Sequence, residues 1–246
     1  MRVEEAKERL KDYLLNGIAR EIFRADEAYS LAVEIGNNAE QINAANFGEF
    51  FGSLQIILSD RQTLSAVKIF DPIKKYPTRS IPGTLSLLED NVDLWEIPGQ
   101  QELHQTLVEA GSEVALVEGL DNVQLTHAIV TYFRDTLPSS EQVDPHKLSV
   151  SLSALRQFRD KTIAHNEDIE AIALPKATWG DATSLVSYAK KFVAIVGIGY
   201  LNLNFGGRFG QDESDDDYAL TSDARRASVN LQRLFKTAGI TETESS

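Results

Sequence analysis

Apolar residues recur every three or four positions over the first 33 residues of the chain. The residues of this stripe are Val3, Ala6, Leu10, Leu14, Ile18, Ile22, Ala25, Tyr29 and Ala32. Such spacing puts the side chains on one face of an α-helix. We therefore predict one long helix that ends at residues 36–38, where a glycine and two asparagines can terminate it and cap the next helix.

A second apolar stripe predicts a helix over residues 47–70. Pro72 stops it, because proline cannot continue a helix. We expect its inward-facing residues to be Phe47, Phe50, Phe51, Leu54, Ile57 and Leu58. The loop that follows ends at Ser80, which together with Ile81 and Pro82 has the pattern of a helix start.

Helical patterns continue through the rest of the chain. Further helices are predicted over residues 100–118, 121–136, 145–165 and 222–238. One more begins near Thr178 and is apolar on most faces, so we expect it at the centre of the fold. With no strand alternation, the patterns predict an all-α, multi-helix bundle. Its expected parts are a bundle of residues 1–204, an acidic loop with glycines at 205–221, an amphipathic helix at 222–240 packed on the same domain, and a disordered tail at 241–246.

Charge and composition narrow the function. The 246 residues include 24 Lys and Arg and 37 Asp and Glu, a net charge of −13. Such a chain has no general attraction for nucleic acid or anionic membranes, so any RNA site must be a local basic patch. Absence of cysteine excludes thiol chemistry. Residues 1–8 are charged, and the apolar run 192–201 is too short to span a bilayer, so we expect a cytoplasmic protein with no membrane partner.

Several cofactor and metal motifs are missing. The chain has no glycine-rich phosphate-binding loop ending in Lys and Ser or Thr. Gly197 and Gly199 lack the third glycine of a dinucleotide fingerprint and are expected to allow close helix packing instead. The four histidines never have zinc-ligand spacing, and the acidic run 212–217 lacks the glycine of a calcium loop. We expect no cofactor and no metal.

One basic residue interrupts an apolar stripe. The stripe consists of Leu148, Leu152, Leu155 and Ile163, and Arg159 falls in its middle. A guanidinium there must be paired or face an opening, because an unpaired buried charge is costly. His165 lies about 120° further round the helix. In a purely structural interpretation, Arg159 pairs with an acid of another helix, His165 caps the helix end, and Arg156 and Asp160 form a surface pair.

The string Arg159, Asp160, Lys161, two further residues, Ala164 and His165 resembles the signature of HEPN domains. These are helical bundles, and the string is similar to their branch in bacterial abortive-infection systems of the U type. Residues 54–72 and the predicted helix after Ser80 are similar to that branch too. The resemblance covers about residues 1–200 and implies an HEPN-like bundle.

The resemblance also implies an activity. It implies a metal-independent endoribonuclease, usually a homodimer, that acts in phage defence or as a toxin, with an antitoxin or other partner protein as a further partner. Arg159 and His165 carry over as the catalytic pair, and Asp160 as the polar residue that assists them. Glu167 stands where the branch often has Asp. The tyrosine that a partner antitoxin modifies in some HEPN toxins is absent.

The residue types suit RNA cleavage. Histidine acts as acid or base near neutral pH, arginine matches phosphate oxygens, and a two-fold dimer supplies two of each. The expected RNA-binding residues are Lys161, Arg156, Lys147, Lys74 and Lys75. The alternative is a non-catalytic helical module that binds a nucleotide or a partner protein. An acid partner for Arg159 in its own chain would favour the structural interpretation, and an Arg–His cleft facing a symmetry mate would favour the enzyme.

Overall fold

The computed structural model describes residues 1–73, 75–109, 119–138, 148–164, 177–205, 209 and 218–241. Its helices are Val3–Asp12 (α1), Tyr13–Ala19 (η1, a π-helix), Arg20–Asn37 (α2), Ala39–Ala44 (α3), Gly48–Ile69 (α4), Ile81–Glu89 (α5), Val92–Leu94 (η2, a 3₁₀ turn), Gln100–Glu109 (α6), Asn122–Thr136 (α7), Leu148–Phe158 (α8), Arg159–Ala164 (η4, a π-helix), Trp179–Leu201 (α9) and Ser222–Thr237 (α11). None of the described residues is in a strand. The all-α class is confirmed.

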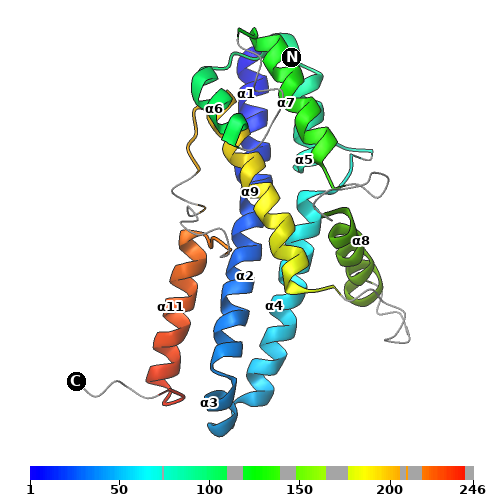
Figure 1. Cartoon of the computed structure of the whole chain (residues 1–246). Helices are drawn as coiled ribbons and strands as arrows, with labels where there is room; N and C mark the ends of the chain where they lie inside the picture. Colours follow the sequence, from blue (N-terminus) through cyan, green and yellow to red (C-terminus); the bar gives the residue numbers. More distant parts are fainter. Residues whose placement is uncertain are drawn as a thin grey trace, which may run out of the picture.

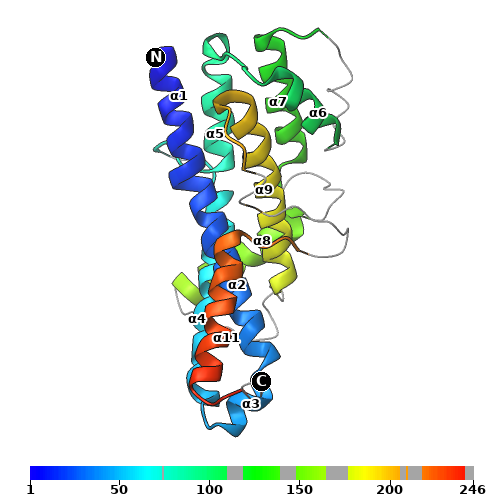
Figure 2. The ribbon, with the colours of Figure 1, turned by 90° about the vertical axis from the view of Figure 1, so that its left-hand side faces the viewer.

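The first predicted helix is a continuous rod made of α1, η1 and α2 (Figures 1 and 2). Ala6, Leu10, Leu14, Ile18 and Ile22 are fully buried along it. Neighbouring members of this set are four positions apart. On a regular α-helix each step of four residues turns the side chain about 40° beyond a full turn. The wider turn of the π-helix compensates for this drift and keeps the whole stripe on the core.

The bundle has a broad end and a narrow end (Figures 1 and 2). At the broad end, α1, α5, α6 and α7 surround one end of α9. Buried apolar residues of these helices form the main core. At the narrow end, α2 and α4 form a hairpin closed by α3, with α11 alongside. A second core fills this end, and its buried residues are Ala28, Ala32, Ile35, Ile42, Phe51, Leu58, Leu231, Phe235 and Ile240.

The prediction of which side of α4 faces inward is wrong in part. Phe51 and Leu58 are buried, but Phe50 is 64% exposed, Ile57 61% and Phe47 43%. This half of α4 packs against the second core along one face. Its apolar residues cover more of the helix surface than that face can bury, so the sequence pattern does not identify the buried side.

Helix α9 is central, as expected. Gly197 and Gly199 allow close packing: a Cβ on Gly197 would lie 2.6 Å from the Phe205 ring, and one on Gly199 would lie 3.0 Å from Leu103. Among the described residues, α9 is the one helix long and apolar enough to span a membrane, but 61% of its most apolar window is buried in the protein. Packing inside the bundle accounts for its apolar character.

A buried ionic network fastens α11 to the bundle. Lys190 of α9 lies 2.9 Å from the carboxylate of Asp26 in α2, which is fully buried. The same carboxylate accepts hydrogen bonds from the Tyr218 hydroxyl and, at 2.8 Å, from the backbone N–H of Thr221. Thr221 caps α11 by accepting from the N–H of Ala224. The acidic residues 212–217 and the tail 242–246 lie outside the described residues.

Candidate functional site

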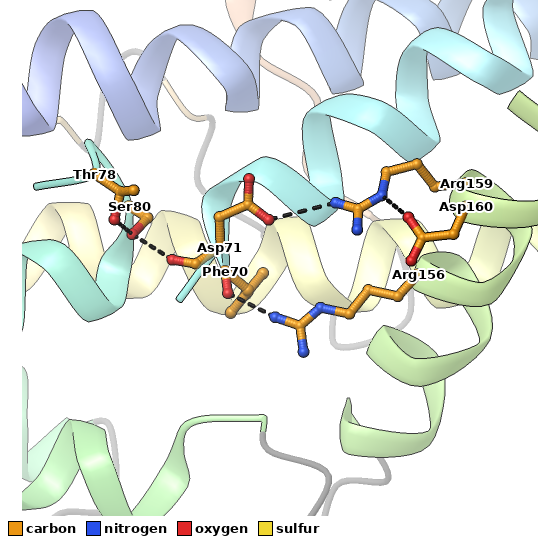
Figure 3. Close-up of polar contacts among 7 residues, drawn as sticks. All are labelled: Phe70, Asp71, Thr78, Ser80, Arg156, Arg159 and Asp160. Carbon is orange, nitrogen blue, oxygen red and sulfur yellow. Dashed lines mark hydrogen bonds and ion pairs between the residues drawn. The ribbon is translucent and has the colours of Figure 1, made fainter. Parts of the chain in front are cut away.

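Two arginines from α8 and η4 reach the C-terminal end of α4 (Figure 3). Arg156 donates from Nη2 to the carbonyl of Phe70 at 2.7 Å. Arg159 donates from Nε to Asp160 at 2.7 Å and from Nη1 to Asp71 at 3.4 Å. The last carbonyls of a helix lack intrahelical donors and carry partial negative charge, so basic side chains are stabilised there. We call Arg156, Arg159, Asp160 and Asp71 the arginine cluster.

Local sequence explains how α8 presents these side chains. Leu148, Leu152 and Leu155 are buried and fix the inner face of the helix. Arg159 continues this face as the first residue of η4, where its side chain is 26% exposed. It therefore lies at the edge of the packed region, between the core and solvent.

The environment of the arginine cluster shifts the pKa values of its two arginines in opposite directions. The hydrogen bond to Asp160 raises the pKa of Arg159 above its ordinary value, with a smaller contribution from Asp71. Burial lowers the pKa of Arg156. Asp160 accepts a hydrogen bond from Arg159, and Arg156 donates one to the carbonyl of Phe70. The negative charge of Asp160 also acts on Arg156 and favours its charged form.

Asp71 connects the arginine cluster to the following loop. Its backbone carbonyl accepts from the Ser80 hydroxyl at 2.7 Å, and the hydroxyls of Thr78 and Ser80 lie 2.9 Å apart (Figure 3). Ser80 also caps α5 by accepting from the N–H of Gly83, as its sequence predicted. Three elements therefore meet at Asp71: the end of α4, the start of α5 and η4.

The remaining predicted site residues are placed as follows. His165, Lys74 and Lys147 lie outside the described residues. Lys161 is half-buried on η4, two residues beyond Arg159. Lys75 is exposed, with its ammonium 5.5 Å from the centre of the Tyr76 ring. The structure thus joins Arg156, Arg159 and Asp160, and no contact among the described residues joins Lys75 to them.

A groove next to the arginine cluster was missed by the sequence analysis. It opens between the rod of α1, η1 and α2 on one side and residues 68, 71 and 77–80 on the other, with a volume of about 780 Å³. Its charged lining residues are Arg9, Arg20, Arg24, Lys68, Arg79, Asp12, Glu21 and Asp71. We call it the basic groove. The signal for it is a stripe of arginines at helical spacing, Arg9, Arg20 and Arg24, on the polar side of the first rod.

The described residues do not assemble a metal site. They contain no group of three or more His, Asp or Glu side chains that could hold a metal ion. The available chemistry is that of guanidinium groups and carboxylates, which bind anions and orient one another.

Comparison with protein-family models, curated proteins and solved structures finds no match to this chain. The fold defines the protein as an all-α helical bundle. The expectation of an HEPN-like bundle rests on the sequence motif that begins at Arg159 and on the segments that precede it.

Proposed function

We propose that this protein is a metal-independent endoribonuclease of HEPN type that works as a homodimer in the cytoplasm, in phage defence or as a toxin. The observation that carries the proposal is the setting of Arg159. It is partly exposed at the end of α8, in the same short motif as His165, and the motif's polar residue Asp160 holds its Nε at 2.7 Å. Its Nη2 has no partner among the described residues, so this donor is available to a phosphate.

The chemistry follows from the two side chains. The 2′-hydroxyl of the substrate attacks the adjacent phosphate once a base removes its proton, and an acid protonates the leaving oxygen. His165 and its counterpart in a second subunit supply base and acid, while Arg159 stabilises the charge that develops on the phosphate. The 3.4 Å bond between Arg159 and Asp71 is long, so a phosphate can replace Asp71 at Nη1.

The first prediction tests this mechanism. Purified protein is incubated with mixed RNA in EDTA, and the product ends are identified by mass spectrometry. We expect cleavage that leaves 2′,3′-cyclic phosphate ends. His165→Ala removes the activity with an unchanged helical circular dichroism spectrum, and Arg159→Lys is severely impaired because lysine lacks the bidentate fork. Products with 3′-hydroxyl ends, a requirement for magnesium, or a strictly monomeric protein in light scattering would contradict the proposal.

The second candidate function is a non-catalytic helical module that binds a nucleotide or a partner protein. The bond from Arg159 to Asp71 favours it, since an acid partner in the same chain is what a structural arginine requires. Arg156 has a structural role of this kind, because it bonds the end of α4. Wild-type protein that is dimeric and folded but leaves RNA uncut would favour this module over the nuclease.

A further inference from the structure

The acidic residues of the basic groove are already paired within the chain, beginning with Asp12. Its carboxylate accepts from Asn16 at 2.9 Å and from Arg79 at 2.7 Å. These hydrogen bonds, that of Asn16 first, lower the pKa of Asp12 despite partial burial. Asp12 therefore neutralises Arg79 and leaves little negative charge for the rest of the groove.

The other two acids are paired in the same way. Glu21 accepts from Arg24 at 2.8 Å and from the Ser65 hydroxyl at 2.9 Å, and its side chain is only 14% exposed. Asp71 accepts from Arg159 of the arginine cluster. Each acid of the groove thus has a cation of its own.

Three cations of the groove remain without an acid partner among the described residues. Arg9 donates to the neutral hydroxyl of Tyr13 at 3.3 Å, with its guanidinium 5.6 Å from the centre of that ring. Arg20 and Lys68 are exposed, and neither side chain makes a hydrogen bond or an ion pair with another described residue. Internal ion pairs therefore do not account for this local excess of positive charge, which stands in a chain of net charge −13.

The walls of the groove are held in place. A Cβ on Gly17 would lie 2.5 Å from the Cβ of Arg79 and 2.7 Å from its carbonyl oxygen, so the loop packs directly on the backbone of η1. The hydrogen bonds of Ser80 fix the other side of the same loop. The groove is therefore formed before any ligand arrives, which reduces the entropic cost of binding.

We propose that the basic groove binds the phosphate groups of a ligand, supplied by a free nucleotide or by an RNA strand. Its volume of about 780 Å³ lies within the range of about 300–1,000 Å³ typical of ligand sites. Guanidinium and ammonium groups on both walls suit a ligand with more than one negative charge, and phosphate oxygens match the arginine fork. The proposal does not depend on RNA cleavage, because none of the three unpaired cations belongs to the arginine cluster.

Binding assays with charge-reversal variants provide the test, as the second prediction. The probes are a fluorescent 2′-O-methyl oligonucleotide, which lacks the attacking hydroxyl and stays intact, and ATP in EDTA as competitor. Arg20→Glu and Lys68→Glu are compared with Arg233→Glu. Arg233 is exposed on α11, has no side-chain partner among the described residues and undergoes the same change of charge.

We expect each groove variant to weaken binding about tenfold at low salt. The slope of log K against log salt should fall by about 0.7 for each phosphate of the strand that a variant no longer neutralises. Arg233→Glu should stay within about twofold of wild type. Oligonucleotide binding that ATP does not displace identifies an RNA strand, and displacement by ATP identifies a free nucleotide. No binding of either probe, or equal weakening by all three variants, would overturn the proposal, whether or not the protein cuts RNA.

Discussion

Phe50 and Phe51 are neighbours in the chain with opposite environments. Phe51 is 5% exposed, and its ring centre lies 5.3 Å from that of Phe235 in α11. Phe50 is 64% exposed, and its ring is T-shaped to that of Phe51 with the ring centres 5.0 Å apart. Burial, and not residue type, therefore decides what each phenylalanine contributes to the free energy of folding.

The third prediction follows from this difference. Phe51→Ala should lower the free energy of unfolding by about 3–5 kcal/mol, because it leaves a cavity between α2, α4 and α11. Phe50→Ala should cost no more than about 1 kcal/mol, the value of an exposed aromatic pair. Urea unfolding at pH 7 measures both. Similar losses for the two variants would show that Phe50 is also packed in solution, for example by a second subunit.

Arg159 illustrates which structural properties of a single residue can be predicted from the sequence. Its place in an apolar stripe requires either an ionic partner or an opening, and both conditions are met: a partner is present and the side chain is 26% exposed. The identity of the partner could not be predicted. Asp71 lies 88 residues earlier in the chain, at the end of another helix, and local spacing carries no information on such a contact.

Helix starts are the features that sequence patterns predicted best at the scale of elements. Ser80 and Thr178 cap α5 and α9 as expected, because a cap is a local interaction within four residues. Thr178 and Asp181 form a reciprocal capping box. Asp181 also accepts from the Ser151 hydroxyl of α8 at 2.6 Å, so the same carboxylate joins two helices.

The fourth prediction concerns the pH dependence of this cap. Burial opposes ionisation of Asp181, but hydrogen bonds from Ser151 and Thr178 outweigh it, and the pKa is lower than usual. A carboxyl with a lowered pKa stabilises the folded state above its unfolded pKa of about 3.9. That stabilisation disappears as the pH falls through the folded pKa.

Asp181→Asn should therefore destabilise the protein by about 1 kcal/mol at pH 7. The difference from wild type should shrink as the pH falls through the lowered folded pKa of Asp181, because below it the carboxyl is protonated in both states. Urea midpoints of the two proteins at pH 7 and at low pH provide the measurement. A difference that stays constant with pH would mean that the carboxylate charge has no role in the cap.

Elements differ in how well their buried face can be predicted. The first rod has one narrow apolar stripe, so its core side follows from spacing alone. Helix α4 has apolar residues on several sides, and its partners α2 and α11 come from the two ends of the chain. Only their arrangement in three dimensions decides that Phe51 is inside and Phe50 outside.

At the scale of the whole molecule, the network around Asp26 joins the C-terminal helix to the rest. Asp26 is fully buried, and the side chain of Lys190 is 10% exposed. Burial of the Tyr218 hydroxyl, and after it the negative charge of Asp26, raise the pKa of Tyr218, so this hydroxyl stays a hydrogen-bond donor at neutral pH. No sequence motif marks this network, since its members come from α2, α9 and residues 218–221.

The fifth prediction is that Asp26→Asn lowers the free energy of unfolding by about 3–5 kcal/mol, because it breaks a buried ion pair with Lys190. Asp223→Asn is the matched control, since its pair with Arg226 is exposed, and it should cost less than about 1 kcal/mol. Hydrogen exchange should show faster opening of α11 in Asp26→Asn alone. Unchanged protection of α11 would mean that the second core holds the helix without the network.

The π-helix η1 makes chain length important for the wall of the basic groove and not for the rotation of α1 relative to α2. A π turn contains one residue more than the α turn it replaces, so η1 is equivalent to a one-residue insertion within a long helix. Deleting a residue between positions 13 and 19 would let the rod close into a regular α-helix with α1 in the same rotation relative to α2, because the wider turn already takes up the extra residue. Ala6 and Leu10 would therefore stay in the core. The change would fall on the wall of the basic groove that Tyr13, Asn16 and Gly17 form. A relative with a chain one residue shorter here would be expected to keep the core and to differ in the groove.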